Sequence, residues 1–132
     1  MYFIGVIHTP WRWRGDCPKR GSHDGPVCSI VVDERWRDAL TDVVQHRHMQ
    51  VLYWMHQARR DLVLQTPLRT GQTTGSFALR SPVRPNPIAS SIVAVVAIEG
   101  TTLHVRGLDC LDGTPLIDLK PDRPAGSGQQ RE

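Results

Sequence analysis

Glycine and proline interrupt this chain so often that long helices are excluded. Its 132 residues include 11 glycines and 10 prolines. Glycine weakens a helix through its backbone entropy, and proline does so through its missing N–H and fixed φ. The runs between them are short and rich in β-branched and aromatic residues, which is typical of strands joined by turns. With 39% hydrophobic residues the chain has enough apolar material for one core, so we expect a single, mainly β domain.

Short apolar segments predict seven strands and one helix. The expected strands span residues 2–8, 27–32, 49–55, 77–79, 91–98, 103–108 and 115–119. The third of these is apolar on both sides, which predicts burial on both faces, and the turn Glu99-Gly100-Thr101 predicts a hairpin. Apolar residues at helical spacing after Asp33 predict one short amphipathic helix over 34–44. These elements favour a single small β-barrel over a doubly wound sheet.

Several kinds of site are excluded by motifs that the chain lacks. No G-x-G-x-x-G follows a strand and no G-x-x-x-x-G-K-[ST] occurs, so the Rossmann-type cradle and the P-loop are absent. Cys17, Cys28 and Cys110 have no C-x-x-C spacing, which predicts reduced thiols rather than a disulfide framework or a zinc ribbon. His46 and His48 have i, i+2 spacing, but no third ligand follows, so we expect no metal site.

Charge and hydropathy indicate the environment of the chain. The formal net charge is +3, with both signs interspersed, which permits nucleic-acid binding without demanding it. The longest apolar run, 92–98, is far shorter than the roughly 20 residues that span a bilayer. Met1 is not followed by a basic and then apolar leader. We therefore expect a cytoplasmic protein that makes no membrane contact.

Residues 79–88, Leu-Arg-Ser-Pro-Val-Arg-Pro-Asn-Pro-Ile, form the densest candidate for a site. Three prolines within six residues restrict the backbone, which predicts a rigid segment without regular secondary structure. Arg80, Arg84 and Asn86 project from it, and guanidinium groups suit carboxylates or phosphates. The alternative is a stiff connector whose arginines pair with surface acids.

Residues 108–115, Leu-Asp-Cys-Leu-Asp-Gly-Thr-Pro, form a second candidate. Asp112-Gly113 is a turn signal, and small residues let the backbone approach a ligand closely. The two carboxylates, Asp109 and Asp112, could hold a ribose diol or simply cap the turn.

Two further features have candidate roles. His56 and Gln57 follow the strand predicted at 49–55, and functional groups are commonly displayed at strand ends; an ordinary strand-terminal residue is the alternative. Residues 11–14, Trp-Arg-Trp-Arg, are followed by Lys19 and Arg20. Interleaved aromatic and cationic side chains suit stacking on RNA bases and binding of phosphates. The alternatives are tryptophans that anchor an exposed loop or form a subunit contact.

Four segments together resemble the TsaA-like family, whose characterised bacterial members are called TrmO. They are Ile-Gly-Val-Ile-His-Thr-Pro at 4–10, Val-Leu-Tyr-Trp-Met-His at 51–56, Arg-Ser-Pro-Val-Arg-Pro-Asn-Pro-Ile at 80–88 and Leu-Asp-Cys-Leu-Asp-Gly-Thr-Pro-Leu-Ile-Asp-Leu-Lys-Pro at 108–121. The resemblance implies a TsaA-like barrel over 1–121 that binds S-adenosylmethionine without a Rossmann fold, usually as a homodimer. It also implies methylation of N6 of threonylcarbamoyladenosine at position 37, in the anticodon loop of tRNA. Composition predicts a flexible tail over 122–132.

The same resemblance implies which residues bind the methyl donor. These are Pro18, Lys19, Arg20, Gly21, His56, Gln57, Arg80, Ser90, Asp112, Gly113, Thr114 and Pro115. Arg80 would clamp the carboxylate of the donor, whereas the turn 112–114 would contact its adenosine part; the two assignments could also be exchanged.

The chemistry of methyl transfer suggests roles for further residues at the methyl acceptor. Asn86 would orient the acceptor base, and either His56 or Asp118 would accept the proton that the acceptor nitrogen loses. Arg12, Arg14 and Arg84 would face the tRNA.

Two alternatives to tRNA methylation remain open. Family members that act on tRNA carry a further C-terminal domain, whereas this sequence ends soon after the predicted barrel. One alternative is a methyltransferase that acts on another RNA or a small molecule, and the other is a non-catalytic S-adenosylmethionine-binding module.

Overall fold

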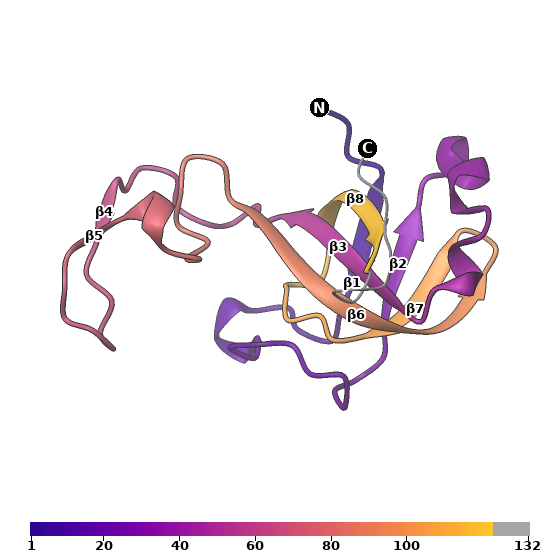
Figure 1. Cartoon of the computed structure of the whole chain (residues 1–132), viewed down its shortest axis with the longest axis horizontal. Coiled ribbons are helices and arrows are strands. Elements are labelled where there is room, and N and C mark those ends of the chain that lie inside the picture. Colours follow the sequence, from indigo (N-terminus) through magenta and orange to yellow (C-terminus); the bar gives the residue numbers. More distant parts are fainter. Residues whose placement is uncertain (123–132) are drawn as a thin grey trace.

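Six antiparallel strands close into a barrel in the computed structural model, which describes residues 1–122 (Figure 1). In spatial order they are β1 (Gly5–His8), β2 (Cys28–Val32), β7 (Thr102–Arg106), β6 (Ile88–Glu99), β3 (His48–Trp54) and β8 (Thr114–Pro121), and β8 pairs in turn with β1. The predicted mainly β fold with a single small barrel is therefore confirmed. The predicted hairpin is confirmed too, because β6 and β7 pair across a turn in which Gly100 has a φ of 61°.

Alternation along each strand places one side of it in the barrel interior. The fully buried side chains there include Ile7, Ile30, Val51, Val93, Leu103 and Leu116. On β3, Met49, Val51 and Tyr53 are buried, whereas the residues between them are only partly covered. The prediction that this strand is buried on both faces is therefore wrong. The opposite face of β3 lies on the outside of the closed barrel.

The predicted amphipathic helix over 34–44 is replaced by two short 3₁₀ segments. They span Glu34–Leu40 and Val43–Gln45, and they are separated by Asp42, whose φ of 72° is incompatible with a continuous helix. No residue of either segment is fully buried. Trp36, Leu40 and Val43 are partly buried and pack against the core, so the apolar spacing correctly predicted the packing face but not the helix type.

Between β3 and β6 the chain forms an arm, residues 56–87, which projects from the barrel (Figure 1). It contains the two-stranded sheet of β4 (Leu64–Gln65) and β5 (Thr74–Gly75). The strand predicted at 77–79 is instead part of a 3₁₀ turn, Ser76–Ala78. The buried Ser76 hydroxyl donates to the Leu62 carbonyl at 2.8 Å, which fixes this turn at the end of β5.

Three smaller predictions concern the cysteines, the membrane and the tail. Cys17, Cys28 and Cys110 are all unpaired thiols, as predicted. Within residues 1–122 no helix has the length and apolar character needed to cross a bilayer. Apart from Asp122, the tail predicted at 122–132 lies outside the described residues.

Candidate functional site

A cavity of about 1010 Å³ opens between the arm and the barrel. We call it the site cavity. Its barrel wall comes from β3 and β6 and from the loop that joins β7 to β8, and its other walls come from the arm and from the β1–β2 loop, which contains the 3₁₀ turn Arg14–Asp16. Segments from almost the whole length of the chain therefore meet around one space.

Ten of the residues predicted to be functional line the site cavity. They are Arg14, Pro18, Lys19, His56, Gln57, Arg80, Arg84, Asn86, Ser90 and Thr114. The sequence features at 12–21, 56–57 and 79–88, which are far apart along the chain, thus meet in space. The other predicted residues do not line it: Arg12, Arg20, Gly21, Asp112, Gly113, Pro115 and Asp118.

The proline-rich segment is held by hydrogen bonds as well as by its prolines. Arg84 donates from Nη1 to the carbonyls of Leu79 and Ser81, at 2.8 and 3.1 Å. Arg60 donates from Nε to the Pro85 carbonyl at 2.7 Å. Arg84 therefore stabilises the segment through hydrogen bonds within it, whereas Arg80 is exposed at the cavity. Arg80 is the more exposed of the two at the cavity, so its guanidinium is the better placed to bind a ligand.

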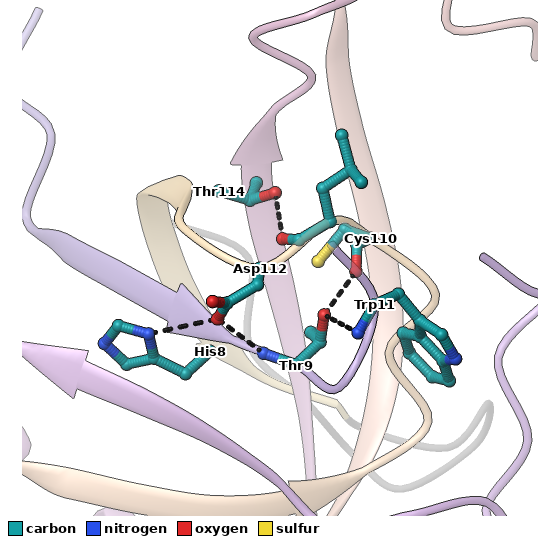
Figure 2. A network of polar contacts seen from close by, with 7 residues as sticks. His8, Thr9, Trp11, Cys110, Asp112 and Thr114 are labelled. Atoms are coloured by element: carbon teal, nitrogen blue, oxygen red, sulfur yellow. Dashed lines mark hydrogen bonds and ion pairs between the residues drawn. The ribbon is translucent and has the colours of Figure 1, made fainter. Parts of the chain in front are cut away.

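The carboxylate of Asp112 is turned toward the end of β1 (Figure 2). One of its oxygens accepts from the Thr9 N–H at 3.1 Å and lies 3.2 Å from His8 Nδ1. Thr9 in turn donates from its hydroxyl to the Cys110 carbonyl at 2.8 Å. These contacts join the turn to the end of β1 and do not go to the backbone of the turn itself, so Asp112 does not cap the turn in the way that the sequence suggested. Gly113, with a φ of 82°, completes the turn.

Gly21 has a structural reason to be glycine. A Cβ at this position would lie 1.8 Å from the carbonyl oxygen of Gly107, so only glycine permits the close approach of the two backbones. This contact brings the β1–β2 loop against the β7–β8 loop, and the neighbouring Pro18 and Lys19 line the site cavity. Gly21 thus helps to determine the shape of the cavity without lining it.

Tyr53 and Asp109 line the site cavity. Asp109 was one of the two carboxylates that the sequence suggested for a ligand, whereas Tyr53 was not predicted as a site residue. The Tyr53 hydroxyl donates to Asp109 Oδ1 at 2.9 Å and lies 2.8 Å from Ser91 Oγ. Tyr53 is only 2% exposed, and its burial, together with the nearby charge of Asp109, raises its pKa well above the ordinary value. The tyrosine therefore stays protonated and serves as a hydrogen-bond donor.

Two cysteines beside this network are also poorly ionised. Burial raises the pKa of the Cys110 thiol to about 12. Burial and the charge of Asp109 raise the pKa of Cys17 as well. Both cysteines line the site cavity, but thiols in this state are weak nucleophiles at neutral pH.

Asp118 lies apart from His56 and Asn86. It contributes to a second cavity of about 290 Å³, which is lined also by Trp36 and Met49. Its carboxylate accepts from the N–H of the next residue, Leu119, at 2.8 Å. Of the two proton acceptors proposed from the sequence, only His56 lines the site cavity.

Comparison with known proteins gives consistent matches over nearly the whole chain. The family whose model matches, over residues 6–125, is described as "tRNA-methyltransferase O N-terminal domain". The chain is 50% identical to a "Probable S-adenosyl-L-methionine-binding protein VirR" of Rhizobium radiobacter, over 93% of this chain and 70% of that protein. It is 39% identical to an "S-adenosyl-L-methionine-binding protein" of Archaeoglobus fulgidus, over 92% of this chain and 87% of that protein.

Among solved structures, the fold is similar to that of TrmO from Pseudomonas aeruginosa. The two have a TM-score of 0.74 and 28% sequence identity. The match covers 96% of this chain but 56% of the TrmO chain. This chain thus spans a little over half the length of that structure.

Proposed function

The chain belongs to the family of the tRNA-methyltransferase O N-terminal domain, and we propose that it is a methyltransferase that binds S-adenosyl-L-methionine in the site cavity. The observation that carries this proposal is the convergence of Lys19, His56-Gln57, Arg80 and Ser90 around one cavity. Residues so far apart in the sequence meet at a space large enough for a ligand of this size.

The walls of the cavity fit the chemistry of this donor. Leu52, Met55 and Leu79 supply apolar surface against which an adenine ring can pack. The exposed guanidinium of Arg80 suits the carboxylate of the amino-acid part, because it can form a charge-assisted pair of hydrogen bonds. The cavity therefore offers both an apolar and a cationic region to one ligand.

In the reaction that we propose, the chain positions the acceptor and takes up one proton. The bound donor supplies an activated methyl group, because its sulfur leaves as a neutral thioether. The bond from sulfur to the methyl carbon breaks as the bond from the acceptor nitrogen to that carbon forms, and the nitrogen loses its proton. Asn86 would orient the acceptor, and His56 would accept the proton, since both line the cavity.

For the acceptor, we propose N6 of threonylcarbamoyladenosine at position 37, in the anticodon loop of tRNA. The description of the matching family as a tRNA-methyltransferase domain supports this choice. Arg14 and Lys19 lie at the cavity wall, and Arg12 and Trp13 are exposed on the same loop. Cationic and aromatic side chains together suit phosphates and unstacked bases. Such an enzyme would act in the cytoplasm.

We also propose that the chain forms a homodimer. Ile88, Ile92 and Val96 are 44%, 38% and 52% exposed along one strand, β6. This apolar row continues from the site cavity, which Ile88 also lines. A second copy of the chain would cover it.

A second candidate function is a non-catalytic S-adenosylmethionine-binding module. The names of the relatives from Rhizobium radiobacter and Archaeoglobus fulgidus support it, since they state binding and no reaction. The two functions share the cavity and the ligand, so an assay of turnover separates them.

Binding is tested by titrating the chain with S-adenosylmethionine in a calorimeter, with Arg80→Ala as the variant and Arg37→Ala as the control. Arg37 pairs with Glu34 on an exposed 3₁₀ segment that does not line the cavity. We expect saturable binding by the wild type and the control, and a loss of about tenfold or more in Arg80→Ala, because a charge-assisted pair is worth about 1.5–3 kcal/mol. Absence of wild-type binding would reject the proposed function.

Turnover is tested by incubating the chain with S-adenosylmethionine and tRNA that carries unmethylated threonylcarbamoyladenosine. Nucleosides from the digested tRNA are then analysed by mass spectrometry. Appearance of the methylated nucleoside, and its loss in His56→Ala, would support the proposed reaction. Binding without any methylated product would favour the non-catalytic module.

A further inference from the structure

Asp109 is an acidic residue in a cavity wall that is otherwise rich in cations. Within residues 1–122 it is the one carboxylate residue that lines the site cavity, where Arg14, Lys19, Arg80 and Arg84 also lie. None of the ion pairs in this part of the chain includes Asp109. Asp109 therefore forms no ion pair within the described residues.

Asp109 is held in place by two residues of the barrel wall. The single proton of the Tyr53 hydroxyl is donated to Asp109 Oδ1 at 2.9 Å. Ser91, whose Oγ lies 2.8 Å from the same hydroxyl oxygen, must then be the donor in that contact. Because Tyr53 is almost completely buried, the chain Ser91–Tyr53–Asp109 is anchored in the core and fixes one carboxylate oxygen. Oδ2 takes part in neither of these bonds.

The fixed carboxylate and the exposed guanidinium of Arg80 give the cavity two regions of opposite charge. The methyl donor that we propose as ligand also has both signs, because it has a carboxylate, an ammonium group and a sulfonium. If Arg80 binds the carboxylate, then a cationic group of the same molecule needs an anion. Among the described residues that line the cavity, Asp109 meets this need.

We propose that Asp109, positioned by Tyr53 and Ser91, binds a positively charged group of the methyl donor and gives the cavity its selectivity for that ligand over uncharged adenosine thioethers. The proposal rests on the proposed binding of S-adenosylmethionine. The shared chemistry is a cation, which can be the ammonium or the sulfonium. The demethylated product S-adenosylhomocysteine distinguishes the two groups, because it keeps the ammonium and lacks the sulfonium.

Asp109→Asn is the variant that tests this, because the amide keeps an oxygen that accepts from Tyr53 and removes the charge. Asp24→Asn is the matched control, since Asp24 is an exposed acid in the β1–β2 loop that does not line the cavity. Three ligands are titrated against each protein: S-adenosylmethionine, S-adenosylhomocysteine and methylthioadenosine, which has neither cationic group nor carboxylate.

We expect Asp109→Asn to weaken binding of S-adenosylmethionine by about tenfold or more, as expected for loss of a charge-assisted contact. Binding of methylthioadenosine should change by less than twofold. Equal weakening for S-adenosylhomocysteine assigns the contact to the ammonium, and unchanged binding of that product assigns it to the sulfonium. The control should bind all three ligands as the wild type does.

Two results would overturn the proposal while the proposed function stands. One is wild-type affinity of Asp109→Asn for S-adenosylmethionine, and the other is an equal loss for methylthioadenosine, which would indicate general damage to the cavity. If the wild type binds no S-adenosylmethionine, the proposed function fails and this inference fails with it.

Tyr53→Phe provides an independent variant if Asp109→Asn does not fold. It keeps the ring in the core and removes the hydroxyl that orients Asp109. Tyr53→Phe should weaken the binding of S-adenosylmethionine more than the binding of methylthioadenosine. The loss of S-adenosylmethionine affinity should be smaller than that expected for Asp109→Asn. Equal affinities of Tyr53→Phe and wild type for S-adenosylmethionine would show that the positioning by Tyr53 does not contribute.

Discussion

Tyr53 connects the barrel core with the site cavity through a single hydroxyl group. Its ring lies among the buried residues of β3, and its oxygen contacts Asp109 in the β7–β8 loop. Burial and the charge of Asp109 both oppose ionisation of this hydroxyl, so its pKa is raised in the folded chain. Because the pKa of this group is higher in the folded than in the unfolded chain, it contributes stability below the unfolded-state pKa. That contribution is lost as the pH rises above this value.

This coupling predicts a loss of stability in alkaline solution. Above the unfolded-state pKa of Tyr53, about 10, the unfolded chain releases a proton that the folded chain retains. The free energy of unfolding should therefore fall as the pH rises, by up to about 1.4 kcal/mol per pH unit for this one group. In Tyr53→Phe this contribution is absent. Urea unfolding of both proteins between pH 8 and 11 measures the two slopes.

The comparison of slopes is informative even though Tyr53→Phe also loses two hydrogen bonds. That loss lowers the stability of the variant by a similar amount at each pH below 10, whereas the titration changes the slope above it. Cys17, Cys28 and Cys110 also have raised pKa values, but all three are retained in Tyr53→Phe and so affect both curves. Parallel curves over the whole range would contradict the prediction.

The Tyr53–Asp109 contact also shows what sequence can and cannot indicate about single residues. Apolar residues on both sides of 49–55 predicted a strand, and the pair Asp109 and Asp112 was a candidate for ligand binding or capping. Such a local pattern does not say that the Tyr53 hydroxyl meets a residue 56 positions away. Nor does it distinguish the two aspartates, of which Asp109 lines the cavity and Asp112 accepts a hydrogen bond from Thr9 at the end of β1.

At the level of elements, the proline-rich segment is the part of the arm that the sequence predicted well. Proline restricts the backbone wherever it occurs, so rigidity at 82–87 follows from composition alone. The prediction of a strand at 77–79 was wrong, because the sequence does not show which residues lie next to these apolar side chains in space. Phe77 is 82% exposed, and the buried Ser76 organises a 3₁₀ turn instead.

Arg84 adds to this segment a restraint that can be removed. Arg84→Ala eliminates the bonds to the carbonyls of Leu79 and Ser81, which should lower the free energy of local opening by about 1–3 kcal/mol. Amide hydrogen exchange at Leu79 and Val83 should then accelerate, whereas exchange at Val51 and Val93 in the barrel should not change.

Arg69→Ala serves as the control for this measurement. Arg69 is exposed in the arm and does not line the site cavity, so its removal should leave exchange at all four amides unchanged. If Arg84→Ala leaves Leu79 and Val83 as protected as in the wild type, the prolines alone hold the segment and the bonds of Arg84 contribute little.

For the molecule as a whole, the barrel was predictable and the position of the arm was not. Many short strands in one small domain favour closure, because a closed barrel leaves no strand edge unpaired. The sequence predicted a candidate site at residues 79–88, but only the structure shows that residues 77–86 of the arm form a wall of the same cavity as the barrel strands. The ligand-binding proposal therefore depends on a spatial relation that the local sequence pattern does not express.

The exposed apolar row on β6 leads to a prediction about assembly. Ile92 and Val96 lie on the outside of the barrel, and Val96 falls at a bulge between Val95 and Ala97 in the pairing with β7. If a second copy covers this row, the wild type should have twice the chain mass in light scattering after gel filtration. Ile92→Glu combined with Val96→Glu should give the single-chain mass, because a dimer would bury two charges from each copy without partners.

Val63→Glu is the matched control for this double variant. Val63 is 73% exposed in the arm, so its substitution should leave the dimer intact, and circular dichroism should show that all variants keep the β-sheet signal. A monomeric wild type would reject the homodimer. A double variant that stays dimeric would place the interface elsewhere, and the row on β6 would then be ordinary exposed apolar surface. A monomeric double variant that still binds S-adenosylmethionine with wild-type affinity would show that one copy of the chain forms a complete donor site.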